Sequence, residues 1–264
     1  MKGAIAARRI IDKLARLVRR MRIPSVRKVS AALAVAVFGL DGGAAQAQNS
    51  PAAQQVLDRA REASGGARGW NTLRGLHETG QDGGVRYERW TDPLRYGDRT
   101  ETHTPAGKHV QAYNGAAEWR ILPSGTITGS VEPMVVAKVR SEAFFGAYAY
   151  YYPSRFDLRS SHIGSREARG RTYDVVRMQP AGGRPRELWF DRGTGLLGQV
   201  VEEVDGKTLT TEISDYRKVG PVTTPFRYVT YGGDLKAPRE RKVEKIDFRP
   251  ADRALFSLPP PKTP

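Results

Sequence analysis

Short segments in which apolar and polar residues alternate follow one another through most of the chain. Val85, Tyr87 and Arg89 would share one face of a strand, while Trp90 would lie on the other. The same alternation, interrupted by Gly, Pro, Asn or Asp, predicts strands over residues 73–79, 85–90, 94–100, 109–113, 117–122, 173–178, 186–190, 197–204, 207–216, 226–231 and 241–248. Such a series predicts a mainly β fold, an antiparallel sheet curled into a barrel or half-barrel.

Two connections between these strands carry clear turn chemistry. Asp205-Gly206 accepts positive φ at both positions, so it predicts a tight type I′ hairpin. Residues 191–195 form a looser turn rich in glycine. Both turns favour strands that run antiparallel to their neighbours.

Two segments are predicted to be helical instead. Ser50 can cap the first helix, Pro51 suits its first turn, and apolar residues recur at helical spacing up to the Gly65-Gly66 pair. Residues 132–152 have helix-like spacing as well, and Pro153 would end them. We expect one N-terminal helix and one or two short central helices.

Aromatic residues gather in this central segment and are otherwise spread over the strands. One interpretation is a helix that packs on the sheet and supplies core. The other is a lid over the mouth of a curled sheet, with an apolar cavity behind it for a lipid chain. On the second interpretation the candidate ligand-binding residues are Trp90, Trp119, Phe144, Phe145, Tyr148 and Tyr151.

Near the N-terminus, a basic segment is followed by a short apolar run and then by small residues. Basic residues between positions 22 and 28 precede the apolar residues 29–40, and Ala45-Gln46-Ala47 follows. This order is typical of a secretory signal peptide, whereas a membrane anchor needs about 20 apolar residues. We expect residues 1–47 to be a basic leader and cleaved signal peptide, with Met21 as an alternative start.

The charge balance changes once this leader is set apart. It carries ten basic and two acidic residues, and therefore +8 of the formal net charge of +15. The rest has too little excess charge to indicate a nucleic-acid partner. The chain has no cysteine, which excludes disulfides and thiolate metal sites. We expect a free periplasmic protein, a monomer, with one domain over residues 48–257 and a Pro-rich tail over residues 258–264.

Motifs for covalent or metal chemistry are missing from the sequence. The four histidines form no H-E-x-x-H pattern, and no G-x-S-x-G elbow, Walker loop or dinucleotide fingerprint occurs. The neighbours Glu202 and Glu203 would point to opposite faces of a strand, so they cannot act together as an acid–base pair. We expect no enzyme activity, no catalytic residue, no metal and no cofactor.

The order of features resembles the outer-membrane lipoprotein-sorting protein superfamily (LolA-like). The resemblance covers the expected exported chain and lies mainly in turns and strand edges. Its motifs are Ala63-Ser64-Gly65-Gly66, Gly170 to Val176, Leu188-Trp-Phe-Asp-Arg-Gly-Thr-Gly-Leu-Leu197, Ile213 to Gly220 with Pro225, and Phe248 with Phe256-Ser-Leu-Pro259.

The resemblance implies an unclosed antiparallel barrel whose concave apolar face is covered by helices and holds acyl chains. It implies a periplasmic carrier or chaperone for a lipid or lipoprotein acyl chain, with inner- and outer-membrane envelope proteins as further candidate partners. This chain is richer in arginine than a dedicated acyl carrier. The alternative is therefore an envelope sensor or protein-interaction module on the same fold, without lipid cargo.

Overall fold

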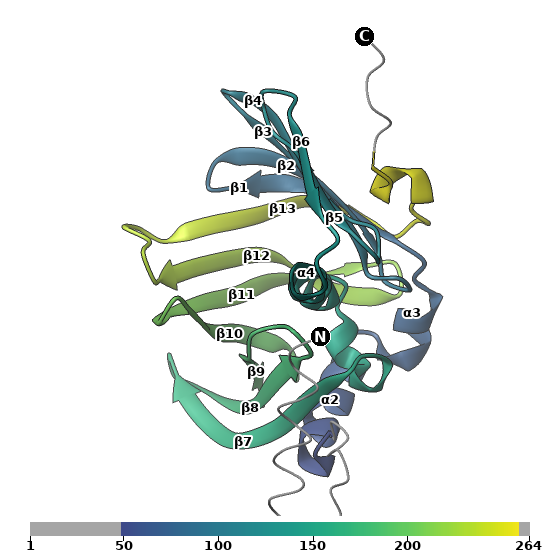
Figure 1. Ribbon diagram of the computed structural model, residues 1–264. Coiled ribbons are helices and arrows are strands. Elements are labelled where there is room, and N and C mark those ends of the chain that lie inside the picture. The colour runs from purple at the N-terminus through teal and green to yellow at the C-terminus, as the bar shows by residue number, and fades with distance from the viewer. Residues whose placement is uncertain (1–48, 259–264) are drawn as a thin grey trace, which may run out of the picture. The chain divides into compact units, whose positions relative to one another are not determined.

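One antiparallel sheet of thirteen strands makes up most of the part that the computed structural model describes, residues 49–258 (Figure 1). The strands are β1 Leu76–Asp82, β2 Val85–Asp92, β3 Gly97–Thr104, β4 Gly107–Tyr113, β5 Glu118–Ile121, β6 Ile127–Ser130, β7 Leu158–Ala168, β8 Arg171–Pro180, β9 Arg186–Asp191, β10 Leu197–Val204, β11 Lys207–Val219, β12 Val222–Gly232 and β13 Arg239–Asp247. Their order is β6-β5-β4-β3-β2-β1-β13-β12-β11-β10-β9-β8-β7. The sheet is not closed, because its two end strands, β6 and β7, do not pair with each other. The predicted mainly β fold with an unclosed antiparallel sheet is confirmed.

Each strand that the alternation predicts overlaps an observed strand, and the turn chemistry also holds. Asp205 and Gly206 adopt φ of 50° and 74°, and Val204 pairs with Lys207 directly behind them. In the looser turn, the Asp191 carboxylate accepts a hydrogen bond from the backbone N–H of Thr194 at 2.8 Å. These two turns join β10 to β11 and β9 to β10.

Between residues 49 and 258 the sheet is accompanied by three helices, of which the first and the last lie in the predicted helical segments. They are α2 Pro51–Ala63, α3 Gly66–Thr72 and α4 Pro133–Gly146, with short 3-10 turns η1 Ala149–Tyr151, η2 Pro153–Arg155 and η3 Arg253–Phe256. The predicted cap of the first helix is confirmed, since the Ser50 hydroxyl accepts a hydrogen bond from the Ala53 N–H at 3.1 Å. In the described part, no helix combines the length and the apolar character needed to cross a membrane.

A second helix, α3, follows the first where the sequence predicted only an end. Gly65 has φ of 125°, and a side-chain Cβ there would lie 2.6 Å from the Pro221 carbonyl oxygen. Gly69, inside α3, is equally close to the same oxygen, at 2.8 Å. Glycine at these positions lets the chain turn sharply and lets α3 rest against the start of β12.

The core lies between the helices and the curved face of the sheet. Figure 1 shows α4 lying within the curve of the strands, with α2 toward the β7–β8 end. Phe144 and Tyr151 are fully buried among sheet residues such as Leu188 and Phe190. The central segment therefore supplies core, as the first interpretation expected. The expected signal segment, residues 1–47, and residues 259–264 of the tail lie outside the described residues.

Candidate functional site

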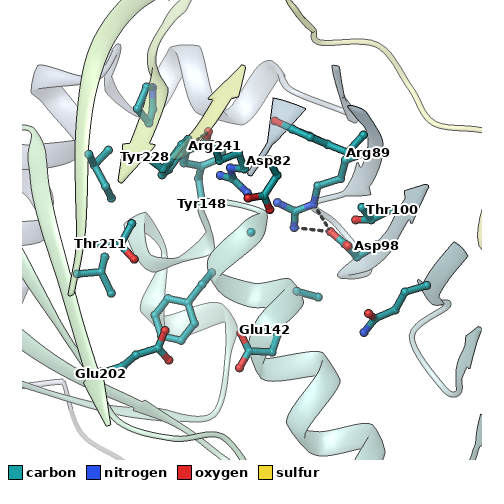
Figure 2. Close-up of a pocket in the computed structure, with 18 of the residues that line it drawn as sticks. Asp82, Arg89, Asp98, Thr100, Glu142, Tyr148, Glu202, Thr211, Tyr228 and Arg241 are labelled. Carbon is teal, nitrogen blue, oxygen red and sulfur yellow. Dashed lines mark hydrogen bonds and ion pairs between the residues drawn. The ribbon is translucent and has the colours of Figure 1, made fainter. Parts of the chain in front are cut away.

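A cavity of about 660 Å³ lies between the curved face of the sheet and α4. Side chains from β1 to β4 and from β9 to β13 line it, and α4 closes it from the other side. Figure 2 shows these side chains pointing toward a common space. Its size lies within the range of small-molecule sites, which are clefts of roughly 300–1,000 Å³.

One part of this cavity is apolar. Leu188, Val200 and Ile213 form its floor on β9, β10 and β11, and Val139 and Phe145 project from α4. Hydrocarbon in this part would be removed from water on both sides. We call this part the apolar end of the cavity.

The α4 helix is tied to the sheet beside the apolar end by a group of ion pairs. Glu142 on α4 pairs with Arg184 at 3.1 Å and also with Arg186. Both arginines also pair with Glu202, at 2.8 and 3.1 Å. The Arg186 guanidinium lies 4.3 Å from the centre of the Phe145 ring. The Glu142 side chain is 40% exposed. Its ion pairs therefore contribute little energy each, and they hold α4 to the sheet only weakly.

The opposite part of the cavity is polar. Arg89 on β2 donates from its Nε to Asp98 at 2.9 Å, and its Nη2 donates to the same oxygen (Figure 2). Burial would lower the pKa of Arg89, but the charges of Asp98 and Glu78 raise it overall. Threonine and glutamine side chains of β3 and β4 continue this wall. We call it the polar end.

The last residue of α4 rests directly on this arginine. A Cβ built on Gly146 would lie 1.9 Å from the Nη2 of Arg89 and 2.9 Å from its Cζ. Only glycine allows the helix backbone to come this close. The end of α4 and the polar end of the cavity therefore share one contact.

A second arginine, Arg241 on β13, also lies in the polar end. Its guanidinium stacks on the ring of Tyr228, 3.9 Å from the ring centre. Behind it, the buried Glu78 carboxylate accepts a hydrogen bond from the Tyr87 hydroxyl. Burial and the charge of Glu78 raise the pKa of Tyr87, so this phenol stays protonated and donates.

Tyr148 separates this cavity from a second one of about 460 Å³, whose walls include Trp70, Leu76 and Tyr96. The Tyr148 hydroxyl is hydrogen-bonded to the Thr224 hydroxyl at 2.8 Å. Burial raises the pKa of Tyr148 well above its usual value, so the hydroxyl is neutral. Its side chain forms a wall common to both cavities.

The structure brings together only part of the candidate set named from the sequence. Phe145 and Tyr148 line the main cavity, whereas Phe144 and Tyr151 are buried beside it in the core. The other two candidates, the tryptophans on β2 and β5, lie apart from it on the other face of the sheet.

These two tryptophans belong to a separate group near the C-terminal segment. Trp90 stacks on His77, with ring centres 5.2 Å apart. Trp119 donates from its Nε1 to the Phe256 carbonyl at 2.9 Å. Arg99 lies over both indole rings, at 5.9 and 5.5 Å. The hydrogen bond from Trp119 attaches η3 to the sheet.

The charged residues of the cavity were not among the sequence candidates. The alternation that places Val85, Tyr87 and Arg89 on one face is confirmed, since all three line the cavity. That pattern was the available signal for the polar end. Arg241 carried no such signal, because Arg239, Glu240 and Lys242 around it are charged as well.

No cluster of three His, Cys, Asp or Glu side chains that could hold a metal ion occurs within residues 49–258. Glu202 and Glu203 lie apart as expected: Glu202 lines the cavity, and Glu203 accepts a hydrogen bond from the exposed Thr208 hydroxyl. A cavity lined in this way can enclose a ligand and orient it by charge.

Solved structures with similar folds exist, although no family model and no curated protein matches this chain. A DUF1329 family protein from Desulfovibrio piger ATCC 29098 is 13% identical with a TM-score of 0.53, covering 78% of this chain and 96% of that one. The LolA superfamily protein NE2245 from Nitrosomonas europaea is 14% identical with a TM-score of 0.51, covering 78% and 97%. The chain therefore has a LolA-like fold, as the resemblance of its sequence predicted. At such identities the likeness concerns the fold alone.

Proposed function

We propose that this protein is a non-catalytic periplasmic carrier or chaperone that holds a lipid or lipoprotein acyl chain in the main cavity. The observation that carries the proposal is the apolar end, where Phe145 on α4 faces Leu188, Val200 and Ile213 on the sheet. The LolA-like fold supports it, because a neighbouring structure is described as a LolA superfamily protein. Partners would include envelope proteins that deliver and receive the chain, and the carrier would act as a monomer.

The apolar end is large enough to contribute useful affinity. Burying one methylene stabilises a complex by about 0.8 kcal/mol, so eight buried methylenes contribute about 6 kcal/mol before the cost of ordering the chain. Entry requires α4 to move away from the sheet. Its ion pairs through Glu142 are partly exposed, so this movement exchanges them for hydrated charges at modest cost.

The test is native mass spectrometry of protein purified from the periplasm, followed by binding of a fluorescent fatty acid to the delipidated protein. Phe145→Asp should weaken probe binding at least tenfold, because it places a carboxylate in the apolar end. Val131→Asp is the matched control, since Val131 is 76% exposed and does not line the cavity. Wild-type protein that carries no lipid and ignores the probe would refute the carrier proposal.

A second candidate function is an envelope sensor or protein-interaction module. It is favoured by the exposed apolar side chains after β6 and in the first turn of α4, where Val131 is 76% and Met134 is 85% exposed. On this alternative, Val131→Asp rather than Phe145→Asp would impair function. The same pair of variants therefore distinguishes the two candidates.

A further inference from the structure

The polarity of the main cavity changes steadily from one side of the sheet to the other. Asp82, Arg241, Tyr228 and Ile213 are successive cross-strand partners on β1, β13, β12 and β11. This row begins with charged side chains, passes through a phenol and ends with an aliphatic side chain. A ligand lying along it would meet charge at one end and hydrocarbon at the other.

A second, neighbouring row repeats the gradient. It runs Arg239, Thr230, Thr211, Val200 and Leu188 across β13 to β9. Neighbouring strands lie about 4.8 Å apart, so four steps cover roughly 19 Å. The cavity is therefore polarised along a length suited to an extended amphiphile.

Arg241 stands out among the charged groups at the polar end, because the others already have partners. Arg89 pairs with Asp98, and Arg239 forms two hydrogen bonds with Asp82, at 2.6 and 3.0 Å. None of the ion pairs among the described residues includes Arg241, and its buried Nε has no hydrogen-bond partner. A half-buried guanidinium group whose Nε is buried without a partner is costly unless an anion completes it.

Tyr228 and the nearby Glu78 hold this guanidinium in place, but no carboxylate of the described residues forms an ion pair with it. Tyr228 supports one face at 3.9 Å. Burial would lower the pKa of Arg241, but the field of Glu78 raises it, so the group stays charged. Glu78 itself is only 2% exposed and already accepts a hydrogen bond from Tyr87. The cation is thus fixed in position where its residue lines the cavity.

We infer that the natural ligand is an acidic amphiphile, whose anionic group binds Arg241 beside Tyr228 while its hydrocarbon extends toward Ile213 and Val200. This inference rests on the proposed carrier function and adds the chemical class of the cargo. A carboxylate or a phosphate monoester would supply the oxygen atoms that Arg241 lacks. A neutral lipid would leave the guanidinium without a partner.

The experiment compares ligands that share a tail and differ in the head. Dodecanoic acid, dodecyl phosphate and methyl dodecanoate compete with an uncharged fluorescent naphthylamine for the delipidated wild-type protein. A charge-assisted hydrogen bond in a buried site raises the affinity roughly tenfold or more. The acid or the phosphate should therefore bind at least about tenfold more tightly than the ester. Dodecanoic acid against dodecyl phosphate distinguishes the two head groups, and inorganic phosphate tests whether the tail is needed.

The matched variants are Arg241→Met and Arg227→Met. Arg241→Met should abolish the preference for acidic heads and leave the ester unchanged. Arg227 lies next to Tyr228 on β12, is 49% exposed and pairs with Glu240, so its variant should behave as wild type. If Arg241→Met does not fold, Arg241→Lys keeps the charge and should retain the preference, and the wild-type comparison needs no variant.

Each result is decisive. Equal binding of acid, phosphate and ester by the wild type would overturn the anion site and leave the carrier function standing. A preference that survives in Arg241→Met, or inorganic phosphate competing as well as dodecyl phosphate, would also overturn the inference. Failure of the naphthylamine and all three amphiphiles to bind would instead refute the carrier function.

Discussion

The contact between Gly146 and Arg89 predicts that Gly146→Ala destabilises the protein. Alanine normally favours a helix over glycine by about 1 kcal/mol, and the φ of Gly146 is not in the left-handed region. Here, however, the new Cβ would lie 1.9 Å from the Nη2 of Arg89. The guanidinium must therefore move away from Asp98, or the end of α4 must lift.

The magnitude follows from the burial of this ion pair. Breaking a buried pair costs about 3–5 kcal/mol, but the Arg89 and Asp98 side chains remain 15% and 20% exposed. A partial loss of about 2–3 kcal/mol, set against a helix gain of about 1 kcal/mol, leaves a net loss of about 1–2 kcal/mol. For a domain of this size, that corresponds to a fall in melting temperature of about 2–8 °C.

The assay is thermal unfolding followed by circular dichroism, in a double-mutant cycle with Arg89→Ala. In the Arg89→Ala background the clash is absent, so Gly146→Ala should be neutral or slightly stabilising. A coupling between the two sites of about 1–3 kcal/mol is expected. Gly146→Ala that is as stable as wild type would refute the close packing of α4 on Arg89.

Two further predictions concern stability away from the cavity. Trp119→Phe removes the hydrogen bond to the Phe256 carbonyl and should lower the free energy of unfolding by about 1 kcal/mol. Amide hydrogen exchange should accelerate more in η3 than in α4. Unchanged exchange in η3 would contradict this role of Trp119. Burial alone would raise the pKa of Asp174, but hydrogen bonds from Arg59 and Ser165 lower it overall. Its folded pKa lies below its unfolded value of about 3.9, so it stabilises the protein above that pH and the contribution is lost as the pH falls below it. Asp174→Asn should therefore flatten the loss of melting temperature between about pH 5 and pH 2, and an unaltered pH profile would count against it.

The sequence predicted the central strands well and missed both edges of the sheet. β6 and β7 escaped notice because an edge strand pairs on one side only and has little apolar alternation. β6 is exposed at three of its four positions, and β7 carries Ser160 and Ser161 where a central strand would have apolar residues. Alternation reports burial rather than hydrogen bonding, so strands with wet faces give a weak signal.

The candidate site was predicted in part, for a related reason. The aromatic segment of α4 and η1 lies beside the cavity, but aromatic residues are as common in cores as in binding sites. Only the fold shows that Phe145 and Tyr148 line the cavity and that Trp90 does not. The pairing state of Arg241 depends on side chains from three strands, which no local pattern contains.

The open edge between β6 and β7 has a mechanical consequence. In a closed barrel, strand number and stagger fix the diameter, so widening the interior would break backbone hydrogen bonds. In this sheet the two end strands are not paired with each other. The α4 helix is attached to the sheet through side chains such as Glu142 and not through backbone hydrogen bonds between strands. The interior can therefore widen by added twist while every interstrand hydrogen bond is kept. How far the cavity can widen then depends on a few side-chain contacts of α4 and on how easily the sheet changes its twist.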